Sequence, residues 1–261
     1  MIKVNGIVIE PKYFPDGTLC SKINTSIVGP FYCAVEWLFE NNEEMVTLYY
    51  LVKYLKDHHK RVELKLPYIP NARQDRTKTD EDVFYLKYFA QFINDLGFAS
   101  VKVRDPHSSV AEALIENLII ENIEKYIKTA ITKCNPDLIF YPDEGSMKRY
   151  SSAAPMEYVF GVKRRDWETG RIEGLDVIGD MEKIKGKNIL IIDDICSRGG
   201  TFLHSAKKLK ELGANKIYLY VTHCENTILE GELLNDDLIE KVFTTKSIFT
   251  KEHEKIEVIE L

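Results

Sequence analysis

The stretch from Asn188 to Thr201 constrains the fold most, because it joins an apolar strand, a polar loop and the start of a helix in one short run. It reads NILIIDDICSRGGT, with the strand expected over Asn188 to Ile192. A helical run to Leu212 follows, and Ile217 to Thr222 has the composition of a further strand. Strand, loop and helix in succession form the repeating unit of parallel α/β sheets. A mainly parallel sheet flanked by helices is therefore predicted around this stretch.

The first half of the chain shows the same alternation of helices and apolar strands. Apolar residues recur at helical spacing between Glu43 and His58, and a strand-like run follows from Val62 to Tyr68. Ligands of parallel α/β sheets bind beyond the carboxyl ends of the strands. We therefore expect an α/β protein of two halves, residues 1–127 and 128–261, whose chemistry lies in the segments that follow strands.

The loop after Ile192 has the residue types of a sugar-phosphate site. Gly199 and Gly200 allow close approach of the backbone, and with Thr201 they present amide and hydroxyl donors at a helix N-terminus, where a phosphate dianion is favoured. Asp193 and Asp194 can accept hydrogen bonds from vicinal ribose hydroxyls or orient magnesium-bound water. A solvated turn would explain a bare pair of aspartates or glycines. The whole string favours a site for a ribose phosphate.

This string resembles the signature of the type I phosphoribosyltransferase superfamily, and other segments resemble one branch of it, the ribose-phosphate pyrophosphokinases. The resemblance implies two tandem phosphoribosyltransferase-like domains. It places the ATP-side segments in residues 1–127, and the ribose 5-phosphate loop with a catalytic flexible loop in residues 128–261. The residues implied in ribose 5-phosphate binding are Asp193, Asp194, Ser197, Arg198, Gly199, Gly200 and Thr201.

The segment PYIPNARQDRTK, residues 67–78, resembles the part of the family that contacts ATP. Arg73 and Gln74 match the family pair, and Asp75 follows them. An arginine suits phosphates or ring stacking, and an amide suits the polar edge of a base. A surface charge cluster would explain RQDR alone, but the flanking residues favour an ATP-binding role.

The segment YFPDGT resembles a family hairpin that reaches into a neighbouring subunit and holds adenine. The resemblance assigns Phe14 and Asp16 to ATP binding, with Thr18 in place of an acidic residue. It also implies a homo-oligomer in which a neighbouring subunit completes the adenine site. An ordinary turn is the alternative, because Pro-Asp-Gly is a common turn sequence.

Two further segments resemble the magnesium and phosphate sites of the family. In VKVRDPHSS, His107 falls on a family histidine at the ATP phosphates and metal, and Asp105 precedes it after a predicted strand. In YPDEGSMKR, Asp143 is a candidate for a second Mg²⁺ site, with Ser146 in place of a family glycine. A structural histidine and an acidic turn are the respective alternatives.

The segment VKRRDW carries two basic residues that resemble the catalytic flexible loop of the family. Lys163 and Arg165 match its lysine and arginine, and a basic mobile loop can close over a triphosphate. A solvated charge cluster is the alternative. With His107, these residues form the predicted catalytic set.

The resemblance predicts transfer of pyrophosphate from Mg–ATP to the C1 hydroxyl of ribose 5-phosphate. A type I phosphoribosyltransferase that uses phosphoribosyl pyrophosphate and a base is one alternative, because CSRGGT is closer to the transferase loop and Ser197 stands where many pyrophosphokinases have an aspartate. A non-catalytic regulatory homologue is another. The ARQDR and DPH segments favour the pyrophosphokinase.

Charge and cysteine content limit the other classes of partner. With 35 Lys and Arg against 41 Asp and Glu, the net charge of −6 argues against a nucleic-acid or anionic-membrane surface. No run approaches the ~18 apolar residues of a membrane span, and MIKVNGIVIEPK lacks the zones of a signal peptide, so we expect a cytoplasmic protein. The five cysteines show no CxxC spacing and are expected to be reduced.

Overall fold

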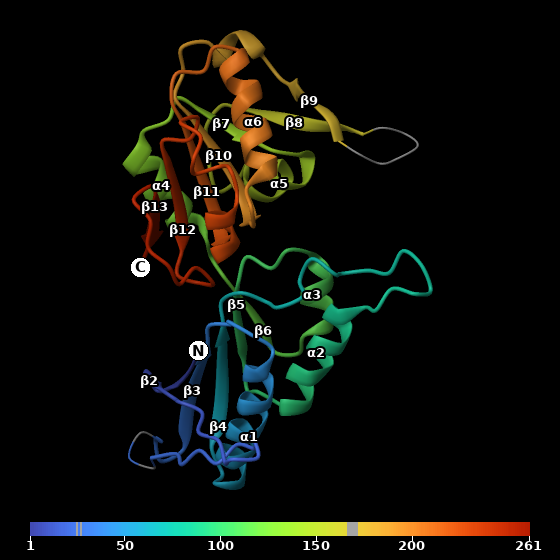
Figure 1. The fold of residues 1–261 in the computed structure, drawn as a ribbon, viewed down its shortest axis with the longest axis vertical. Helices are drawn as coiled ribbons and strands as arrows, with labels where there is room; N and C mark the ends of the chain where they lie inside the picture. Colours follow the sequence, from blue (N-terminus) through green and yellow to red (C-terminus); the bar gives the residue numbers. More distant parts are fainter. Residues whose placement is uncertain (25, 27, 166–171) are drawn as a thin grey trace. The chain divides into compact units, whose positions relative to one another are not determined.

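The structure is a computed structural model of the chain, and it describes residues 1–24, 26, 28–165 and 172–261, without the side chains of residues 163–165 and 172–175. The chain divides into two compact units, Met1–Glu121 and Asn122–Leu261. Each unit is a sheet accompanied by helices (Figure 1). Helix α4, Glu124–Cys134, belongs wholly to the second unit, whereas the predicted division at residue 127 falls within it.

The described part of the first unit contains a six-stranded sheet in the order β2-β1-β3-β4-β5-β6. Its strands are β1 (Ile2–Val4), β2 (Ile7–Val8), β3 (Tyr32–Trp37), β4 (Arg61–Leu66), β5 (Val101–Arg104) and β6 (Leu118–Glu121). The pairs β3–β4, β4–β5 and β5–β6 are parallel, and β1 is antiparallel to both β2 and β3. The helices are α1 (Glu43–Asp57), α2 (Tyr85–Leu96) and α3 (Ser109–Leu114).

Helix α1 confirms the helical spacing read from the sequence. Leu48, Leu51, Val52 and Leu55 are buried, which makes a single apolar stripe along one side of the helix. The stripe packs into the core of the first unit with residues of β3 and β4. Helix α2 ends at Gly97, which adopts the left-handed conformation with φ 60° that a glycine accepts without strain.

In the described part of the second unit, seven strands form a sheet in the order β13-β12-β11-β10-β7-β8-β9. They are β7 (Leu138–Tyr141), β8 (Tyr158–Arg165), β9 (Ile172–Ile178), β10 (Ile189–Cys196), β11 (Ile217–Cys224), β12 (Lys241–Thr245) and β13 (Ile256–Ile259). Strand β9 is antiparallel to β8, and the other neighbouring pairs described are parallel. The predicted class, two mainly parallel sheets with helices, is confirmed.

Helices and 3₁₀ turns connect the strands of the second unit and cover its sheet. Besides α4, they are α5 (Glu144–Tyr150), α6 (Gly200–Glu211), η2 (Met181–Ile184) and η3 (Asn226–Glu230). Strand β10 is buried on both faces: Ile189 and Ile191 pack in one core cluster, and Leu190 and Ile192 pack in the other. Each such side chain contributes about 1.5–3 kcal/mol of burial free energy, so the strand is a firm support for the loop that follows it.

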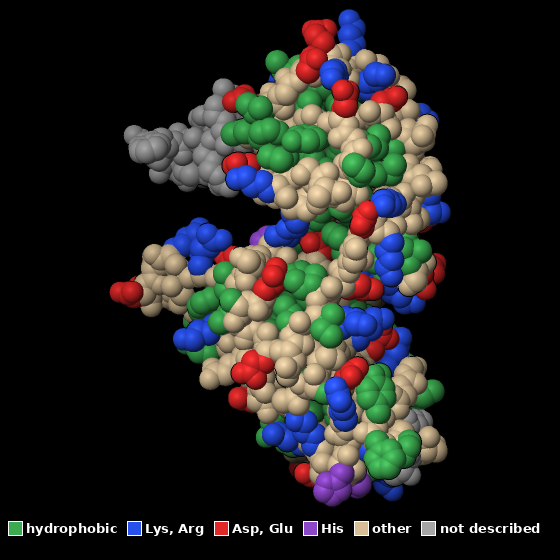
Figure 2. Space-filling model, turned by 180° about the vertical axis from the view of Figure 1, so that it is seen from behind, with side chains coloured by type: hydrophobic (Ala, Val, Ile, Leu, Met, Phe, Trp, Pro, Cys, Tyr) green, Lys and Arg blue, Asp and Glu red, His purple; other side chains and the backbone are tan. Residues whose placement is uncertain are grey.

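The surface carries charges of both signs. On the face drawn in Figure 2, Lys and Arg side chains are interspersed with Asp and Glu and do not gather into one broad basic area. Within the described ranges, none of the helices has the length and apolar character needed to cross a bilayer.

Candidate functional site

Strand β10 is longer than its apolar run suggested. The sequence predicted an end at Ile192, but β10 continues through Asp193 and Asp194 to Cys196, so this expectation was wrong. The cause is pairing with β11, which extends to the partners Cys196 and Cys224. The two aspartates are therefore held by a strand and not by a free loop.

The two aspartates differ in burial and in their partners. Asp194 is buried; its Oδ2 lies 3.1 Å from Arg149 Nη1, and its Oδ1 accepts a hydrogen bond from the backbone N–H of Ile195 at 2.7 Å. Asp193 is half-buried and accepts from the N–H of Asp194 at 3.0 Å. Asp193 is therefore the more accessible carboxylate, and Asp194 is fixed in place from α5.

Arg149 was not among the predicted site residues, although it stands at the end of the YPDEGSMKR segment. Its position in α5 brings it to Asp194 because α5 follows β7, and β7 is the parallel neighbour of β10. The carboxyl ends of neighbouring parallel strands lie at the same sheet edge. The sequence did contain a sign of this role. The family segment that YPDEGSMKR resembles ends in an arginine, and Arg149 stands at that position, four residues after Gly145.

The glycines of the loop have separate structural reasons. Gly199 caps the N-terminus of α6 with φ 80°, in the left-handed region, and a Cβ there would lie 2.7 Å from Leu233 Cδ2. Gly200, the first residue of α6, is exposed, and a Cβ there would meet no atom within 4 Å. Open space beside the N-terminal amides of a helix is suited to a phosphate group.

Ser197 and Arg198 are the residues that differ from the loop of the family, and both contact η3. The hydroxyl of Ser197 lies 3.1 Å from Thr227 Oγ1. The guanidinium of Arg198 lies 3.1 Å from Glu230 Oε2, and the two side chains are 71% and 60% exposed. An ion pair of this exposure contributes at most about 1 kcal/mol, so Arg198 is held only weakly.

Asp143 begins α5 as its N-cap. Its side chain accepts from the N–H of Ser146 at 3.0 Å, and the hydroxyl of Ser146 lies 3.3 Å from the N–H of Asp143, which makes a capping box. Ser146 replaces a family glycine, and its hydroxyl completes this cap. The cap holds the Asp143 carboxylate at the carboxyl end of β7, in the same unit as the loop between β10 and α6.

In the first unit, the RQDR and DPH segments lie together at the carboxyl ends of the neighbouring strands β4 and β5. Asp75 is buried and accepts from Arg76 Nε at 2.8 Å and Nη2 at 3.1 Å. These bonds lower the pKa of Asp75 below its usual value, with further lowering from the Ser108 hydroxyl and the charge of nearby His107. Arg73 and Gln74, just before Asp75, are exposed.

Asp105 and His107 follow β5 by way of an unusual backbone. Asp105 is buried with φ 43°, a left-handed conformation that residues other than glycine adopt rarely. The preceding Arg104 is also buried and pairs with Glu121 at 2.7 Å, which ties the ends of β5 and β6 together. The strained turn after β5 is thus held on one side by this ion pair, and His107 is half-buried beyond it.

The donor chemistry of the candidate metal residues suits magnesium in part. Carboxylate oxygens, present at Asp105 and Asp143, are the donors that Mg²⁺ prefers, whereas a histidine nitrogen such as that of His107 is a softer ligand. Among the described residues, no three His, Cys, Asp or Glu side chains stand together as a preformed cage. A site with so few protein ligands fits a magnesium ion that arrives with substrate phosphates.

The YFPDGT segment is a tight turn. Phe14 is 57% exposed, and its N–H donates to the carbonyl of Thr18 at 2.8 Å. Asp16 Oδ1 accepts from the N–H and the hydroxyl of Thr18, at 3.0 and 2.7 Å, and these bonds lower the pKa of Asp16. Thr18, which replaces a family acidic residue, therefore closes the turn, and Phe14 stands outward from it.

The backbone of Lys163 and Arg165 lies in β8, where Lys163 pairs with Leu175 of β9. The side chains of both residues lie outside the described part of the structure, as do residues 166–171 of the same predicted loop. Their catalytic role stays a prediction from the sequence.

Comparisons with known proteins point to one family. A family model described as the phosphoribosyl synthetase-associated domain matches residues 167–261. A ribose-phosphate pyrophosphokinase of Aquifex aeolicus is 30% identical over 260 residues, covering 95% of this chain and 82% of that protein. A ribose-phosphate pyrophosphokinase of Sulfurisphaera tokodaii is 26% identical over 270 residues, covering 100% and 91%.

A solved structure agrees with the two-unit fold. The crystal structure of phosphoribosylpyrophosphate synthetase from Mycobacterium smegmatis matches with a TM-score of 0.78 at 19% identity, covering 97% of this chain and 85% of the other. Identity this low supports the fold alone. The predicted fold, two phosphoribosyltransferase-like halves in one chain, therefore agrees with that of a solved protein.

Proposed function

Because this chain belongs to the ribose-phosphate pyrophosphokinase family, we propose that it transfers the pyrophosphoryl group of Mg–ATP to the C1 hydroxyl of ribose 5-phosphate. The products are phosphoribosyl pyrophosphate and AMP. The observation that carries the proposal is the end of β10, where Asp193 and Asp194 are held by the strand, followed by a short loop and the open N-terminus of α6 at Gly200.

The second unit supplies the ribose 5-phosphate site. The N–H groups at the start of α6, with the Thr201 hydroxyl, receive the 5-phosphate, because they offer donors and a favourable dipole end. Asp193 accepts hydrogen bonds from the ribose hydroxyls. Asp194 binds Arg149 and so fixes the end of β10 against α5. Ser197, Arg198 and Gly199 complete the loop.

The first unit supplies the ATP side. Arg73 and Gln74 are exposed beside the buried Asp75, so a nucleotide can contact their side chains while Asp75 fixes the turn. His107 lies on the neighbouring loop and binds phosphate. The outward-facing Phe14, with Asp16 holding its turn, stacks on the adenine bound by a neighbouring subunit, so the active form is a homo-oligomer.

Asp105 and His107 of the first unit would hold one magnesium ion, and Asp143 of the second unit would hold a second. When bound, Mg²⁺ neutralises phosphate oxygens and so favours attack on phosphorus. The protein's own contribution is positive charge and orientation: Lys163 and Arg165 stabilise charge on the transferring group, and Asp193 holds the sugar for in-line attack.

The covalent change is a single displacement. The C1 oxygen of ribose 5-phosphate forms a bond to the β-phosphorus of ATP. The bond from that phosphorus to the oxygen that bridges it to the α-phosphorus breaks, and AMP leaves with that oxygen. The hydroxyl proton passes to water. We place this reaction in the cytoplasm, since the five free cysteines suit a reducing compartment.

A label in the β-phosphate of ATP tests the proposed function. With ribose 5-phosphate and magnesium, the label is expected in a sugar pyrophosphate, and the AMP released is unlabelled. A phosphoribosyltransferase would leave the label in ATP and would instead consume phosphoribosyl pyrophosphate when a base is supplied.

A further inference from the structure

The segment that follows β11 is in close contact with the ribose-phosphate loop. The N–H of Glu225 donates to the carbonyl of Cys196 at 2.8 Å. Gly231, just after η3, has no room for a side chain, because a Cβ there would overlap the backbone carbonyl of Arg198. The loop after β10 therefore rests directly on residues 225–231.

Three side chains form a hydrogen-bonded chain across this contact. Thr227 Oγ1 lies 3.2 Å from Glu225 Oε2 and 3.1 Å from Ser197 Oγ. An ionised carboxylate only accepts, so the single hydroxyl proton of Thr227 goes to Glu225. The Thr227 oxygen then accepts from Ser197, which leaves the lone pairs of Ser197 Oγ for another donor.

We propose that Glu225 is a positioning residue, acting through Thr227 and Ser197, which makes Ser197 Oγ an acceptor for a hydroxyl group of bound ribose. The proposal rests on the proposed ribose 5-phosphate site. A phosphate oxygen needs a donor, so Ser197 in this orientation recognises the sugar and not the phosphate. Many family members have an aspartate where this protein has Ser197. The hydrogen bonds from Ser197 through Thr227 to Glu225 restore an acceptor at this position.

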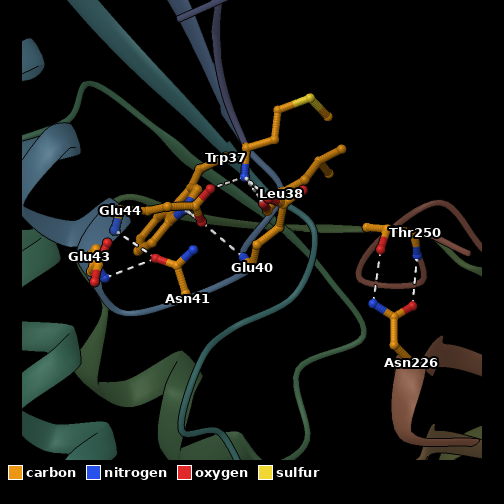
Figure 3. Close-up of polar contacts among 9 residues, drawn as sticks. Trp37, Leu38, Glu40, Asn41, Glu43, Glu44, Asn226 and Thr250 are labelled. Atoms are coloured by element: carbon orange, nitrogen blue, oxygen red, sulfur yellow. Dashed lines mark hydrogen bonds and ion pairs between the residues drawn. The ribbon is translucent and has the colours of Figure 1, made fainter. Parts of the chain in front are cut away.

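A separate pair of hydrogen bonds holds the start of η3. Asn226 Nδ2 donates to Thr250 Oγ1 at 2.8 Å, and the N–H of Thr250 donates to Asn226 Oδ1 at 3.0 Å (Figure 3). Removing the Thr250 hydroxyl therefore loosens the start of η3 without touching the hydrogen-bonded chain to Ser197. Thr250→Val is a matched control for Thr227→Val.

The test is calorimetric titration of ribose 5-phosphate into the full-length protein, with inorganic phosphate as a competing probe. Thr227→Val is expected to weaken ribose 5-phosphate binding about fivefold, the effect of one neutral hydrogen bond, and to leave phosphate binding unchanged. Glu225→Leu, which has no acceptor for the Thr227 hydroxyl, is expected to weaken ribose 5-phosphate binding as well. Ser197→Asp in the Thr227→Val background restores binding, because an aspartate is an acceptor without help from Thr227.

Three results would overturn the proposal: equal weakening by Thr250→Val, parallel weakening of phosphate binding, or no recovery with Ser197→Asp. If Thr227→Val does not fold, Ser197→Ala provides the same comparison and must show the same selective loss. Binding is measured without turnover, so an absence of AMP formation counts against the proposed function alone. A wild-type protein that binds no ribose 5-phosphate contradicts both.

Discussion

Arg149 of α5 donates a hydrogen bond to the buried carboxylate of Asp194 in β10, with 3.1 Å between Nη1 and Oδ2. The Asp194 side chain is 11% exposed and that of Arg149 is 32% exposed, so water screens the pair only in part. The contact joins α5, which follows β7, to the end of β10. It makes Arg149 part of the support of the ribose-phosphate loop.

Arg149→Leu is expected to lower the free energy of unfolding by about 1–3 kcal/mol and to weaken ribose 5-phosphate binding, because it leaves a buried carboxylate without this partner. Urea denaturation and titration with ribose 5-phosphate measure the two effects. The neighbouring Lys148→Leu is the control, since Lys148 pairs with Glu144 where both side chains are more than 60% exposed. Equal losses in the two variants would refute a special role for Arg149.

The stability contributed by Asp75 should depend on pH. Arg76 lowers the pKa of Asp75 in the folded chain, so the unfolded chain, with a carboxyl pKa of about 3.9, binds the proton more readily. This contribution is present above that value and is lost as the pH falls through the folded pKa. The unfolding free energy of wild type should therefore exceed that of Asp75→Asn at pH 7, and this difference should narrow as the pH falls below about 4. A gap that does not change with pH contradicts this account.

Gly231 is expected to tolerate no side chain. Gly231→Ala should lower the free energy of unfolding by about 1–3 kcal/mol and weaken ribose 5-phosphate binding, because the methyl group pushes on the carbonyl of Arg198. Gly200→Ala, where a Cβ meets open space, should leave stability unchanged when both variants are unfolded in urea. Equal free energies of unfolding for Gly231→Ala and Gly200→Ala would contradict the close contact between Gly231 and the carbonyl of Arg198.

Lys163→Ala is expected to lower turnover by orders of magnitude while ribose 5-phosphate affinity is nearly retained, because its charge acts on the group in transfer. Steady-state rates and direct titration separate the two quantities. A large loss of affinity with normal turnover would instead make Lys163 a binding residue.

The sequence predicted what is local. The apolar run of β10, the aspartates after that run and the glycines at the start of α6 specify a strand, a loop and a helix start without knowledge of the rest of the chain. The length of β10 was underestimated, because its last residues are held by pairing with β11 and not by their own hydrophobicity.

Contacts between distant residues could not be read from the sequence. Arg149 meets Asp194 across 45 positions, and Ser197 meets Thr227 across 30, through the order in which β7, β10 and β11 lie in the sheet. Before that order is known, Thr227 is one polar residue among many. The substitution of Ser197 in the loop was visible in the sequence, but the partner that explains it was not.

The central claim is tested most directly by incubating the protein with ATP, ribose 5-phosphate and magnesium and following AMP. We predict AMP formation that requires both substrates and is nearly abolished by Lys163→Ala. AMP that forms without ribose 5-phosphate, or no AMP at any concentration of magnesium or phosphate, would contradict the assignment of this chain as an active ribose-phosphate pyrophosphokinase.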